Sequence, residues 1–278
     1  MWRVLLACLW LAACTSPGGG KDPPLRVMAF NVRVPVEADG PDRWEARRDR
    51  LVDTIRDVRP DVIGTQELVE AQARYIVEAL PAYTWFGRGR RGGQGDASDE
   101  HMGVFYRRDA LRLIESGDFW LSDTPDVPGS ISWGNLYPRM VTWGLFERVA
   151  NGRLFYLLDT HLPYREQDGP ARERSAQAIL EWVAKLPADV PVVLTGDFND
   201  VPDSETYRTL LRKLHDARVE APVREGPDGT FHGFKGEPGK RIDWVLFRGL
   251  QPRRAATLTV HADGRYPSDH FPVLVEFD

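Results

Sequence analysis

The stretch VPVVLTGDFND, from Val190 to Asp200, joins an apolar run directly to a cluster of polar side chains. Its aliphatic and β-branched residues predict a buried strand. Asp197, Asn199 and Asp200 then follow this strand closely. Because Asp, Asn and Gly are common turn formers, the stretch by itself also fits an ordinary loop. The other apolar runs of the chain decide between a loop and a functional site.

The same arrangement, an apolar run beside a polar side chain, recurs along the sequence. A single case carries little weight, since a lone histidine such as His161 fits a satisfied, half-buried structural role equally well. The repetition is informative, because strands that share a sheet can bring their tips to one pocket. The acids, amides and imidazoles in this position are Asn31, Glu67, His161, Asp197, Asn199, Asp243, Asp269 and His270.

Length and composition predict a folded chain with one core. The chain has 278 residues, of which 42% are apolar, enough for one large domain. Charges of both signs are mixed and the formal net charge is −5, so the sequence lacks the overall basic field that draws proteins to nucleic acid. No linker, low-complexity tract or internal repeat follows Leu25. We therefore predict a single domain over residues 25–278.

The N-terminus differs from the rest of the chain. Its apolar run, 4–13, is shorter than the ~20 residues that a membrane span needs, and its length fits a signal peptide over residues 1–13. The sequence LAAC, ending at Cys14, resembles a bacterial lipobox. That resemblance implies cleavage before Cys14 and diacylation of its sulfur. An ordinary secretory signal is the alternative.

The segment that follows predicts how the domain is attached. Residues 14–24 are rich in Gly and Pro and are expected to form a flexible tether. Cys8 would leave with the signal peptide, so the mature chain has no disulfide. By its resemblance to lipoproteins the protein is expected to be extracytoplasmic and membrane-anchored. Since Thr15 rather than an aspartate follows Cys14, a host with two membranes would send it to the outer one.

Hydrophobic periodicity predicts a mixture of helices and strands. Several neighbouring strands have no helix between them, which excludes a pure βαβ repeat and favours two mixed sheets with helices outside. Amphipathic helices are predicted over 42–58, 69–80, 170–186 and 204–217. Besides the strand of the opening stretch, strands are predicted over 25–32, 60–67, 83–88, 102–108, 111–121, 139–149, 153–161, 241–247, 254–262 and 271–277.

Six short motifs occur in a fixed order between Asn31 and His270: FN, TQE, DTH, GDFND, RIDWV and SDH. Together they resemble those of the endonuclease/exonuclease/phosphatase superfamily. This group includes DNase I, apurinic endonucleases, bacterial sphingomyelinases, inositol polyphosphate phosphatases and nocturnin-type deadenylases. The resemblance implies an α+β fold, the DNase I-like four-layer αββα sandwich of two mixed β-sheets flanked by helices. It also implies a metal-dependent phosphoesterase.

The resemblance to this superfamily assigns a metal site to three of the polar residues that lie beside the apolar runs. It makes Glu67 the principal ligand, completed by Asn31 and Asp269. Hydrolysis of a phosphate ester needs a hard cation on the phosphate oxygens, and Mg²⁺ prefers oxygen ligands, so Mg²⁺ is the expected cofactor, with Mn²⁺ as its substitute. Zinc is less well supported, because the mature chain would offer no free cysteine thiol and no HExxH-like histidine pair.

The resemblance also implies the catalytic roles. Asp197 would orient or deprotonate the attacking water, and Asn199 would hold that water and a phosphate oxygen. His270 would donate to the phosphate, with Asp243 keeping its imidazole oriented and protonated. His161 would be a second donor to phosphate or the acid for the leaving group. A strand that ends at these side chains would hold them preorganised.

Substrate recognition is less clearly marked. Glu100 lies where some members place a carboxylate that pairs with a catalytic histidine. Arg139 resembles an arginine that faces the phosphate, although a surface arginine fits as well. The basic patch of Arg88, Arg90 and Arg91 fits either a phosphate-steering loop or a solvated surface.

Two classes of function remain open: a phosphoesterase, or a catalytically inactive binding protein with the same fold. As an enzyme it would be a magnesium-dependent hydrolase, with a slight lean to a nuclease, either a 3′–5′ exonuclease or an endonuclease. That lean comes from the segments FWLSDTP and RIDWVLF, which resemble the bacterial branch near the nocturnins. The alternatives are a phospholipid or sphingomyelin-type phosphodiesterase and a phosphatase of small phosphate esters. We expect a monomer whose partners are its phosphate-ester substrate, nucleic acid or lipid headgroup included, and the membrane.

Overall fold

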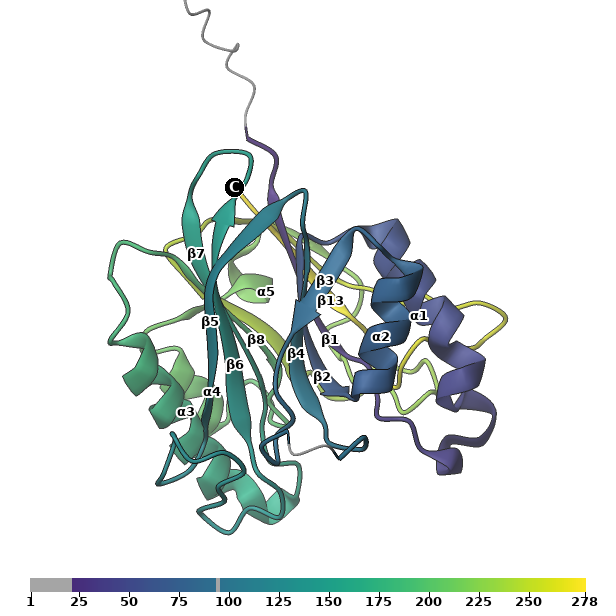
Figure 1. Cartoon of the computed structure of the whole chain (residues 1–278), viewed down its shortest axis with the longest axis horizontal. Coiled ribbons are helices and arrows are strands. Elements are labelled where there is room, and N and C mark those ends of the chain that lie inside the picture. Colours follow the sequence, from purple (N-terminus) through teal and green to yellow (C-terminus); the bar gives the residue numbers. More distant parts are fainter. Residues whose placement is uncertain (1–21, 94–95) are drawn as a thin grey trace, which may run out of the picture.

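Two β-sheets pack face to face, and helices cover their outer surfaces (Figure 1). The computed structural model describes residues 22–93 and 96–278. The predicted signal peptide, Cys14 and most of the tether lie outside these residues. The two mixed sheets with flanking helices confirm the predicted αββα sandwich.

The first sheet has seven strands in the order β10-β12-β13-β1-β2-β4-β3. β1 runs parallel to β2 and antiparallel to β13, so the sheet is mixed. The strands are β1 (Leu25–Asn31), β2 (Val62–Leu68), β3 (Tyr83–Phe86), β4 (His101–Arg107), β10 (Val223–Glu225), β12 (Pro252–Thr257) and β13 (Val273–Phe277).

The second sheet has six strands in the order β5-β6-β7-β8-β11-β9. β7 and β8 are parallel, and β8 pairs with β11 in the antiparallel sense. The strands are β5 (Leu111–Trp120), β6 (Met140–Arg148), β7 (Leu154–His161), β8 (Val192–Asp197), β9 (His215–Asp216) and β11 (Asp243–Arg248).

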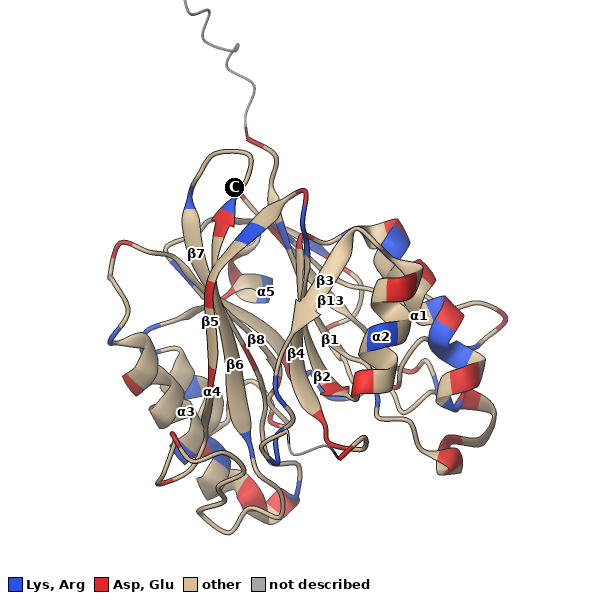
Figure 2. Cartoon of the chain, in the orientation of Figure 1, with Lys and Arg blue, Asp and Glu red and all other residues tan. Residues whose placement is uncertain are grey.

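Apolar packing explains the four layers. Ile55 and Ile76 of two helices pack against Met28 on the outer face of the first sheet, and Ile179 of another helix packs against Leu194 on the second. In Figure 2 the charges lie largely on helix surfaces and loops, whereas the strands are mostly uncharged. No helix in the described part of the chain has the length and apolarity of a membrane span. The helices are α1 (Trp44–Val58), α2 (Glu70–Ala79), α3 (Gly169–Val183), α4 (Glu205–Leu210) and α5 (Ala217–Glu220), with 3-10 turns η1 (Glu37–Asp42) and η2 (Glu166–Asp168).

The predicted helix over 204–217 is wrong in its second half. α4 ends at Leu210, and Asp216 pairs with Leu246 of β11 in the short strand β9. The Asp216 carboxylate also accepts a hydrogen bond of 2.8 Å from the Tyr207 hydroxyl. These contacts hold the chain extended at Asp216, so the helix does not continue.

The strand predicted over 254–262 is too long, and β10, like β9, was not predicted. β12 ends at Thr257, after which the Leu258 amide bonds to the carbonyl of Pro272 and the chain leaves the sheet. β10 is a three-residue edge strand whose side chains are all exposed, so it has no apolar alternation to reveal it.

Strand direction brings the predicted polar tips to one edge of the sandwich. β1 and β2 run parallel, with Asn31 at the end of β1 and Glu67 next to the last residue of β2, while β7 and β8 run parallel and end at His161 and Asp197. Asp243 begins β11 opposite Asp197. Residues from both sheets therefore meet at this edge, as the sequence predicted.

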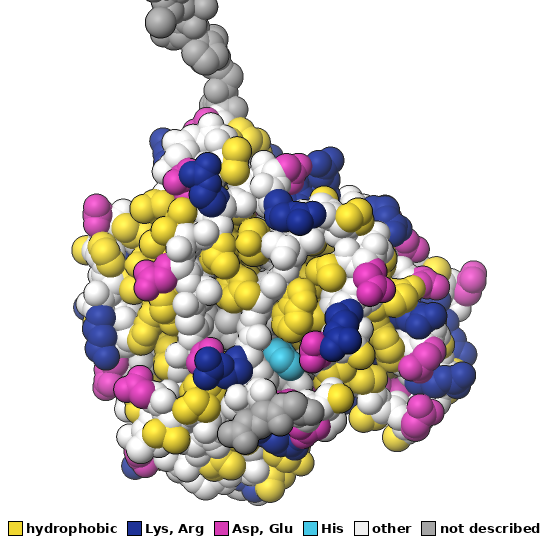
Figure 3. All heavy atoms as spheres, in the orientation of Figure 1, with side chains coloured by type: hydrophobic (Ala, Val, Ile, Leu, Met, Phe, Trp, Pro, Cys, Tyr) yellow, Lys and Arg dark blue, Asp and Glu magenta, His cyan; other side chains and the backbone are white. Residues whose placement is uncertain are grey.

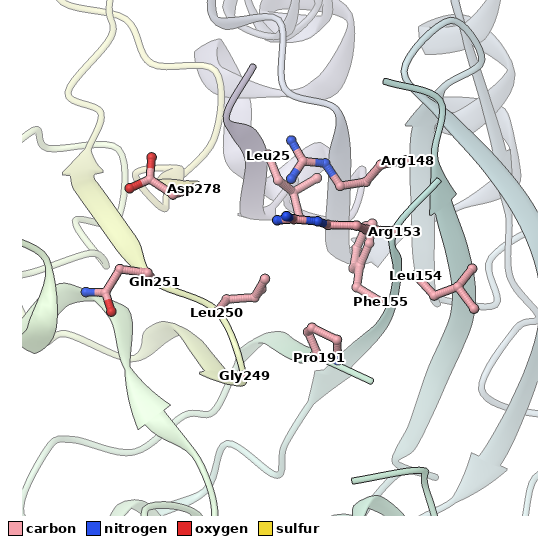
Figure 4. A pocket seen from close by; sticks show the side chains of 10 residues that line it. All are labelled: Leu25, Arg148, Arg153, Leu154, Phe155, Pro191, Gly249, Leu250, Gln251 and Asp278. Atoms are coloured by element: carbon pink, nitrogen blue, oxygen red, sulfur yellow. The ribbon is translucent and has the colours of Figure 1, made fainter. Parts of the chain in front are cut away.

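The opposite edge holds the entry into β1 and the C-terminus, since Leu25 pairs with Phe277 (Figure 1). A hollow of about 300 Å³ lies there, lined by Leu25, Phe155, Pro191 and Leu250 among others (Figure 4). It contains none of the predicted site residues, so it is a separate feature at the far end of the sheets.

Candidate active site

The predicted side chains surround a pocket of about 600 Å³ at the strand-tip edge. Asn31 and Asp243 lie behind its wall, where they are almost completely buried. The predicted residues that line the pocket are Glu67, Glu100, Arg139, His161, Asp197, Asn199, Asp269 and His270.

Asn31 ties the two sheets together inside the site. Its Nδ2 donates to Glu67 Oε1 at 3.1 Å and to Asp197 Oδ2 at 3.0 Å. Its Oδ1 accepts from the backbone amide of Arg33 at 3.0 Å, so in this arrangement Asn31 holds two carboxylates in place. Asp197 Oδ1 in turn accepts from the Asn199 amide at 2.9 Å.

Glu67 and Asn199 both adopt a left-handed backbone conformation, with φ of 60° and 50°. Such conformations cost about 1–3 kcal/mol and cluster at functional sites. At Glu67 the pairing of β2 with β4 shifts register between Thr65 and Leu68, which breaks the normal alternation of side chains. This irregularity lets the Glu67 carboxylate reach the pocket.

His270 and Asp243 form a buried ion pair. His270 Nδ1 donates to Asp243 Oδ2 at 2.9 Å, and its Nε2 lies 3.8 Å from Asp197 Oδ2. Burial alone would lower the pKa of His270, but the carboxylates of Asp243 and Asp197 raise it well above its ordinary value. The imidazole is therefore charged at neutral pH and can donate into the pocket.

His161 also faces the Asp197 carboxylate, but its imidazole is neutral whereas that of His270 is charged. Its Nε2 lies 3.6 Å from Asp197 Oδ2. Burial, with Arg139 and Arg90 nearby, lowers the pKa of His161 well below its ordinary value. Burial and the Asp243 carboxylate raise the pKa of Asp197 to about 7, which suits a group that exchanges protons near neutral pH.

The donor atoms fit a divalent cation. One oxygen or nitrogen from each of Glu67, His161 and Asp197 lies within 4.8 Å of the others. Asp269 is linked to Glu67 through Arg33, whose guanidinium lies 3.8 Å from each carboxylate. A set dominated by carboxylate oxygens matches the preference of Mg²⁺ and Mn²⁺.

A second trio, Asp197, Asp243 and His270, also brings its donor atoms within 4.8 Å. Asp243 and His270 already satisfy one another in their ion pair. Glu67 and its neighbours are therefore the better place for a cation.

Two arginines lie buried in the pocket wall. Arg90 pairs with Glu100 at 2.6 Å and stacks over the Tyr137 ring at 4.7 Å. Arg139 donates to the His161 carbonyl at 3.3 Å, and among the described residues it makes no ion pair. Burial and neighbouring Arg90 lower the pKa of Arg139 to about 10, so it remains charged at neutral pH.

The Glu100 carboxylate thus pairs with Arg90, and no described hydrogen bond or ion pair joins it to a histidine. Sequence reasoning treated Arg90 only as part of a surface patch and did not single out Tyr164, Phe231 or Lys240, which also line the pocket. These residues lie in loops, where no hydrophobic periodicity marks their direction. Their proximity to the predicted motifs was the only available signal.

The chain matches the profile of the Endonuclease/Exonuclease/phosphatase family over residues 28–270. This match covers most of the chain and contains all of the residues that line the pocket. The chain belongs to the endonuclease/exonuclease/phosphatase family.

Solved structures and curated proteins agree with this assignment. A family member from Bacteroides thetaiotaomicron is 32% identical, with a TM-score of 0.86 over 93% of this chain and 98% of that one. A mannosyl-6-phosphatase from the same species is also 32% identical, with a TM-score of 0.84 over 91% and 99%. Human nocturnin is 23% identical over 92% of this chain and 65% of its own length.

Family membership agrees with the chemistry of the pocket. Members of the endonuclease/exonuclease/phosphatase family hydrolyse phosphate esters, and the site supplies carboxylates, a charged imidazole and buried arginines. The coarse assignment is therefore a phosphoesterase with a metal-binding site.

Proposed function

We propose that this protein is a divalent-metal-dependent phosphoesterase whose substrate is a small phosphomonoester of the sugar-phosphate class. The observation that best supports phosphoesterase activity is the arrangement of side chains around Asn31. Glu67 and Asp197, from different sheets, both accept from its amide, and the charged His270 lies 3.8 Å from Asp197. Two carboxylates and a charged imidazole thus face one point in the pocket.

The residues divide the reaction between them. Asp197 accepts a proton from the attacking water, a role that suits a carboxyl with a pKa of about 7. His270, kept charged by Asp243, donates to a phosphate oxygen and stabilises charge in the transition state. Glu67 and Asp269 would hold Mg²⁺ or Mn²⁺, whose charge would offset that of the phosphate oxygens.

The balance of buried charge favours a phosphomonoester. Arg90 pairs with Glu100, whereas Arg139, which the carboxylates of Glu100, Asp197 and Glu67 all influence, makes no ion pair among the described residues and so offers its positive charge to a phosphate. A phosphomonoester dianion carries more negative charge than a diester and gains more from that charge. The relative named as a mannosyl-6-phosphatase, 32% identical over almost the whole chain, supports a sugar phosphate.

A nuclease is the second candidate. Tyr164 and Phe231 line the pocket with 54% and 40% of their surface exposed, and exposed aromatic rings can stack on bases. The similarity to nocturnin also favours it. Against it, positive and negative side chains are interspersed over the face shown in Figure 3, and the formal net charge is −5. Such a surface offers little attraction to a long polyanion.

We also propose that Cys14 anchors the protein to a membrane with its active site directed away. Leu25 and the pocket lie at opposite ends of β1. A tether over 14–24 reaches at most ~40 Å when fully extended. This placement favours substrates in solution over headgroups of the membrane that holds the anchor.

A panel of esters tests the substrate proposal. Purified protein with Mg²⁺ is assayed on p-nitrophenyl phosphate, its bis-ester, mannose 6-phosphate, single-stranded DNA and RNA, and sphingomyelin vesicles, with Asp197→Asn as the control. We expect kcat/KM for the monoesters to exceed that for the bis-ester by about tenfold or more. Preference for single-stranded nucleic acid would replace the phosphatase with the nuclease. Failure to hydrolyse any phosphate ester would reject both.

A further inference from the structure

A buried polar cluster joins the two sheets behind the pocket. Gln66 Nε2 on β2 donates to Asp159 Oδ1 on β7 at 2.7 Å, and Thr195 Oγ1 on β8 donates to the same oxygen at 2.7 Å. All three residues are completely buried. We call this cluster the Gln66–Asp159–Thr195 bridge. Its Gln66–Asp159 hydrogen bond crosses from the first sheet to the second.

Each member of the bridge lies immediately beneath a pocket residue. Side chains two residues apart on a strand point to the same face, so fixing one constrains the direction of the other. On β2 the spacing is one residue, because the left-handed conformation at the strand's end reverses the alternation. The pairs are Gln66 and Glu67 on β2, Asp159 and His161 on β7, and Thr195 and Asp197 on β8.

Gly64 allows the sheets to approach closely at this point. A β-carbon placed on Gly64 would lie 2.1 Å from Thr195 Oγ1 and 2.3 Å from Asp159 Oδ1. No side chain fits within these distances, so the backbone of β2 rests directly against the bridge. The separation of the sheets beneath the pocket is therefore set by glycine and by the bridge's hydrogen bonds.

The bridge has no part in binding the substrate. None of its three residues lines the pocket. No described lysine, arginine or histidine forms an ion pair with Asp159, and burial raises the pKa of its carboxyl well above the ordinary value. Its interactions are hydrogen bonds, whose directionality fixes the relative position of three strands.

We propose that the Gln66–Asp159–Thr195 bridge is a positioning device that sets the distance between Glu67 on one sheet and Asp197 on the other. This inference rests on the proposed function, because it explains how that site keeps its geometry. At the pocket wall, Asn31 is the only described side chain that hydrogen-bonds to both of these carboxylates. The bridge supplies a second link one layer deeper and holds Glu67 in its left-handed conformation.

Four variants test the proposal. Gln66→Met and Thr195→Val remove one donor each at nearly constant volume, and Asp159→Asn keeps the oxygen that accepts both bonds. Tyr83→Phe is the matched control: it removes a buried hydrogen bond, also of 2.7 Å, to the Pro60 carbonyl at the far edge of the sandwich. All are assayed well below their unfolding midpoints, by hydrolysis of the best ester and by binding of Mn²⁺ alone.

We expect Gln66→Met to lower kcat by about tenfold or more, with KM nearly unchanged, and to weaken Mn²⁺ binding by about fivefold or more. Thr195→Val should lower kcat less, and the double variant should lose less than the product of the two single losses. Asp159→Asn should retain kcat within about threefold of the wild type. Tyr83→Phe should lower the unfolding midpoint without changing kcat or Mn²⁺ binding.

Loss of stability in Gln66→Met with kcat and Mn²⁺ affinity equal to those of Tyr83→Phe would overturn the positioning role. A loss of kcat in Asp159→Asn as large as in Gln66→Met would overturn it too, because retaining the acceptor oxygen would then not preserve the geometry of the site. If the wild type hydrolyses no ester, the proposed function fails. The Mn²⁺ measurement still tests the bridge in that case, since weaker binding in Gln66→Met than in Tyr83→Phe supports it and equal binding rejects it.

Discussion

His161 and His270 both face Asp197, yet their neighbours move their pKa values in opposite directions. Burial and two arginines keep His161 neutral, whereas the Asp243 carboxylate keeps His270 charged. One carboxylate thus lies between a neutral and a charged imidazole. This difference supports the proposed roles of Asp197 as the proton acceptor and of His270 as the donor to phosphate.

The first prediction at this scale concerns Asp197. Asp197→Asn keeps the shape but cannot accept a proton from water, so kcat should fall by at least about a thousandfold. The unfolding midpoint should stay equal or rise, because an amide avoids the cost of burying a charge. Steady-state kinetics and thermal unfolding check both. A loss of activity below about tenfold would remove Asp197 from the catalytic list.

The second residue-scale prediction concerns the ion pair. Asp243 acts through His270, since its carboxylate contacts the imidazole at 2.9 Å and lies behind the pocket wall. Asp243→Asn and His270→Ala should each lower kcat strongly, and the double variant should be little worse than His270→Ala alone. Steady-state kinetics of the wild type, the two single variants and the double variant measure this double-mutant cycle. Fully additive losses would mean that Asp243 has a role independent of His270.

Among the elements, strand tips were the most predictable feature. Apolar runs such as FYLLDTH reveal both the strand and the residue at its end, and the pairing of parallel strands brings His161 and Asp197 together. The residues at which helices and strands end were harder to predict. The helix over 204–217 ended early because Asp216 pairs with β11, a contact between residues distant in sequence.

The pocket wall was predicted less well than its centre. Motifs mark Glu67 and Asp197, but Arg90 and Phe231 come from loops, and only the folded chain shows that their side chains enter the pocket. The partner of Glu100 could not be predicted for the same reason. Alternation along a strand predicts which way a side chain points, and nothing comparable exists for an irregular loop.

At the level of the paired sheets, Asp159 predicts a pH dependence of stability. Burial raises the pKa of its carboxyl, so the folded chain keeps a proton that the unfolded chain releases above about pH 4. This contribution to stability is complete below that pH and is lost as the pH rises toward the raised pKa. Asparagine does not titrate. The unfolding midpoint of Asp159→Asn minus that of the wild type should therefore increase from about pH 4 to about pH 8.

Thermal unfolding at several pH values, with Tyr83→Phe as a reference, measures this difference. The reference should follow the wild type, because Tyr83 lies at the far edge and its own pKa is raised beyond this range. A difference for Asp159→Asn that stays constant across the range would contradict a neutral Asp159.

The pocket and the entry of the chain lie at opposite ends of the molecule. The strand tips of both sheets form the pocket at one end, and the chain enters β1 at the other (Figure 1). Lipidation of Cys14 would place the second end toward a membrane. Acyl chains contribute ~0.8 kcal/mol per buried CH₂, so several chains on one cysteine would hold the protein there durably.

We predict that the wild-type protein fractionates with membranes and incorporates labelled fatty acid. Cys14→Ser should do neither, yet it should keep its hydrolytic activity if secreted, since the described chain enters β1 at the end away from the pocket. Fractionation, labelling and an ester assay on the same cultures check this. Soluble wild-type protein cleaved at a site other than Cys14 would contradict the anchor and leave the active-site assignment unchanged.

Dependence of hydrolysis on a divalent cation at Glu67 tests the central claim most directly. The measurement is the rate of p-nitrophenyl phosphate hydrolysis after exhaustive chelation with EDTA and during readdition of Mg²⁺ or Mn²⁺, for the wild type and Glu67→Gln. Wild-type activity should disappear on chelation and return with either ion, and Glu67→Gln should need about tenfold or more of the ion for half its maximal rate. Full turnover by the chelated enzyme, or an unchanged ion requirement in Glu67→Gln, would contradict the account.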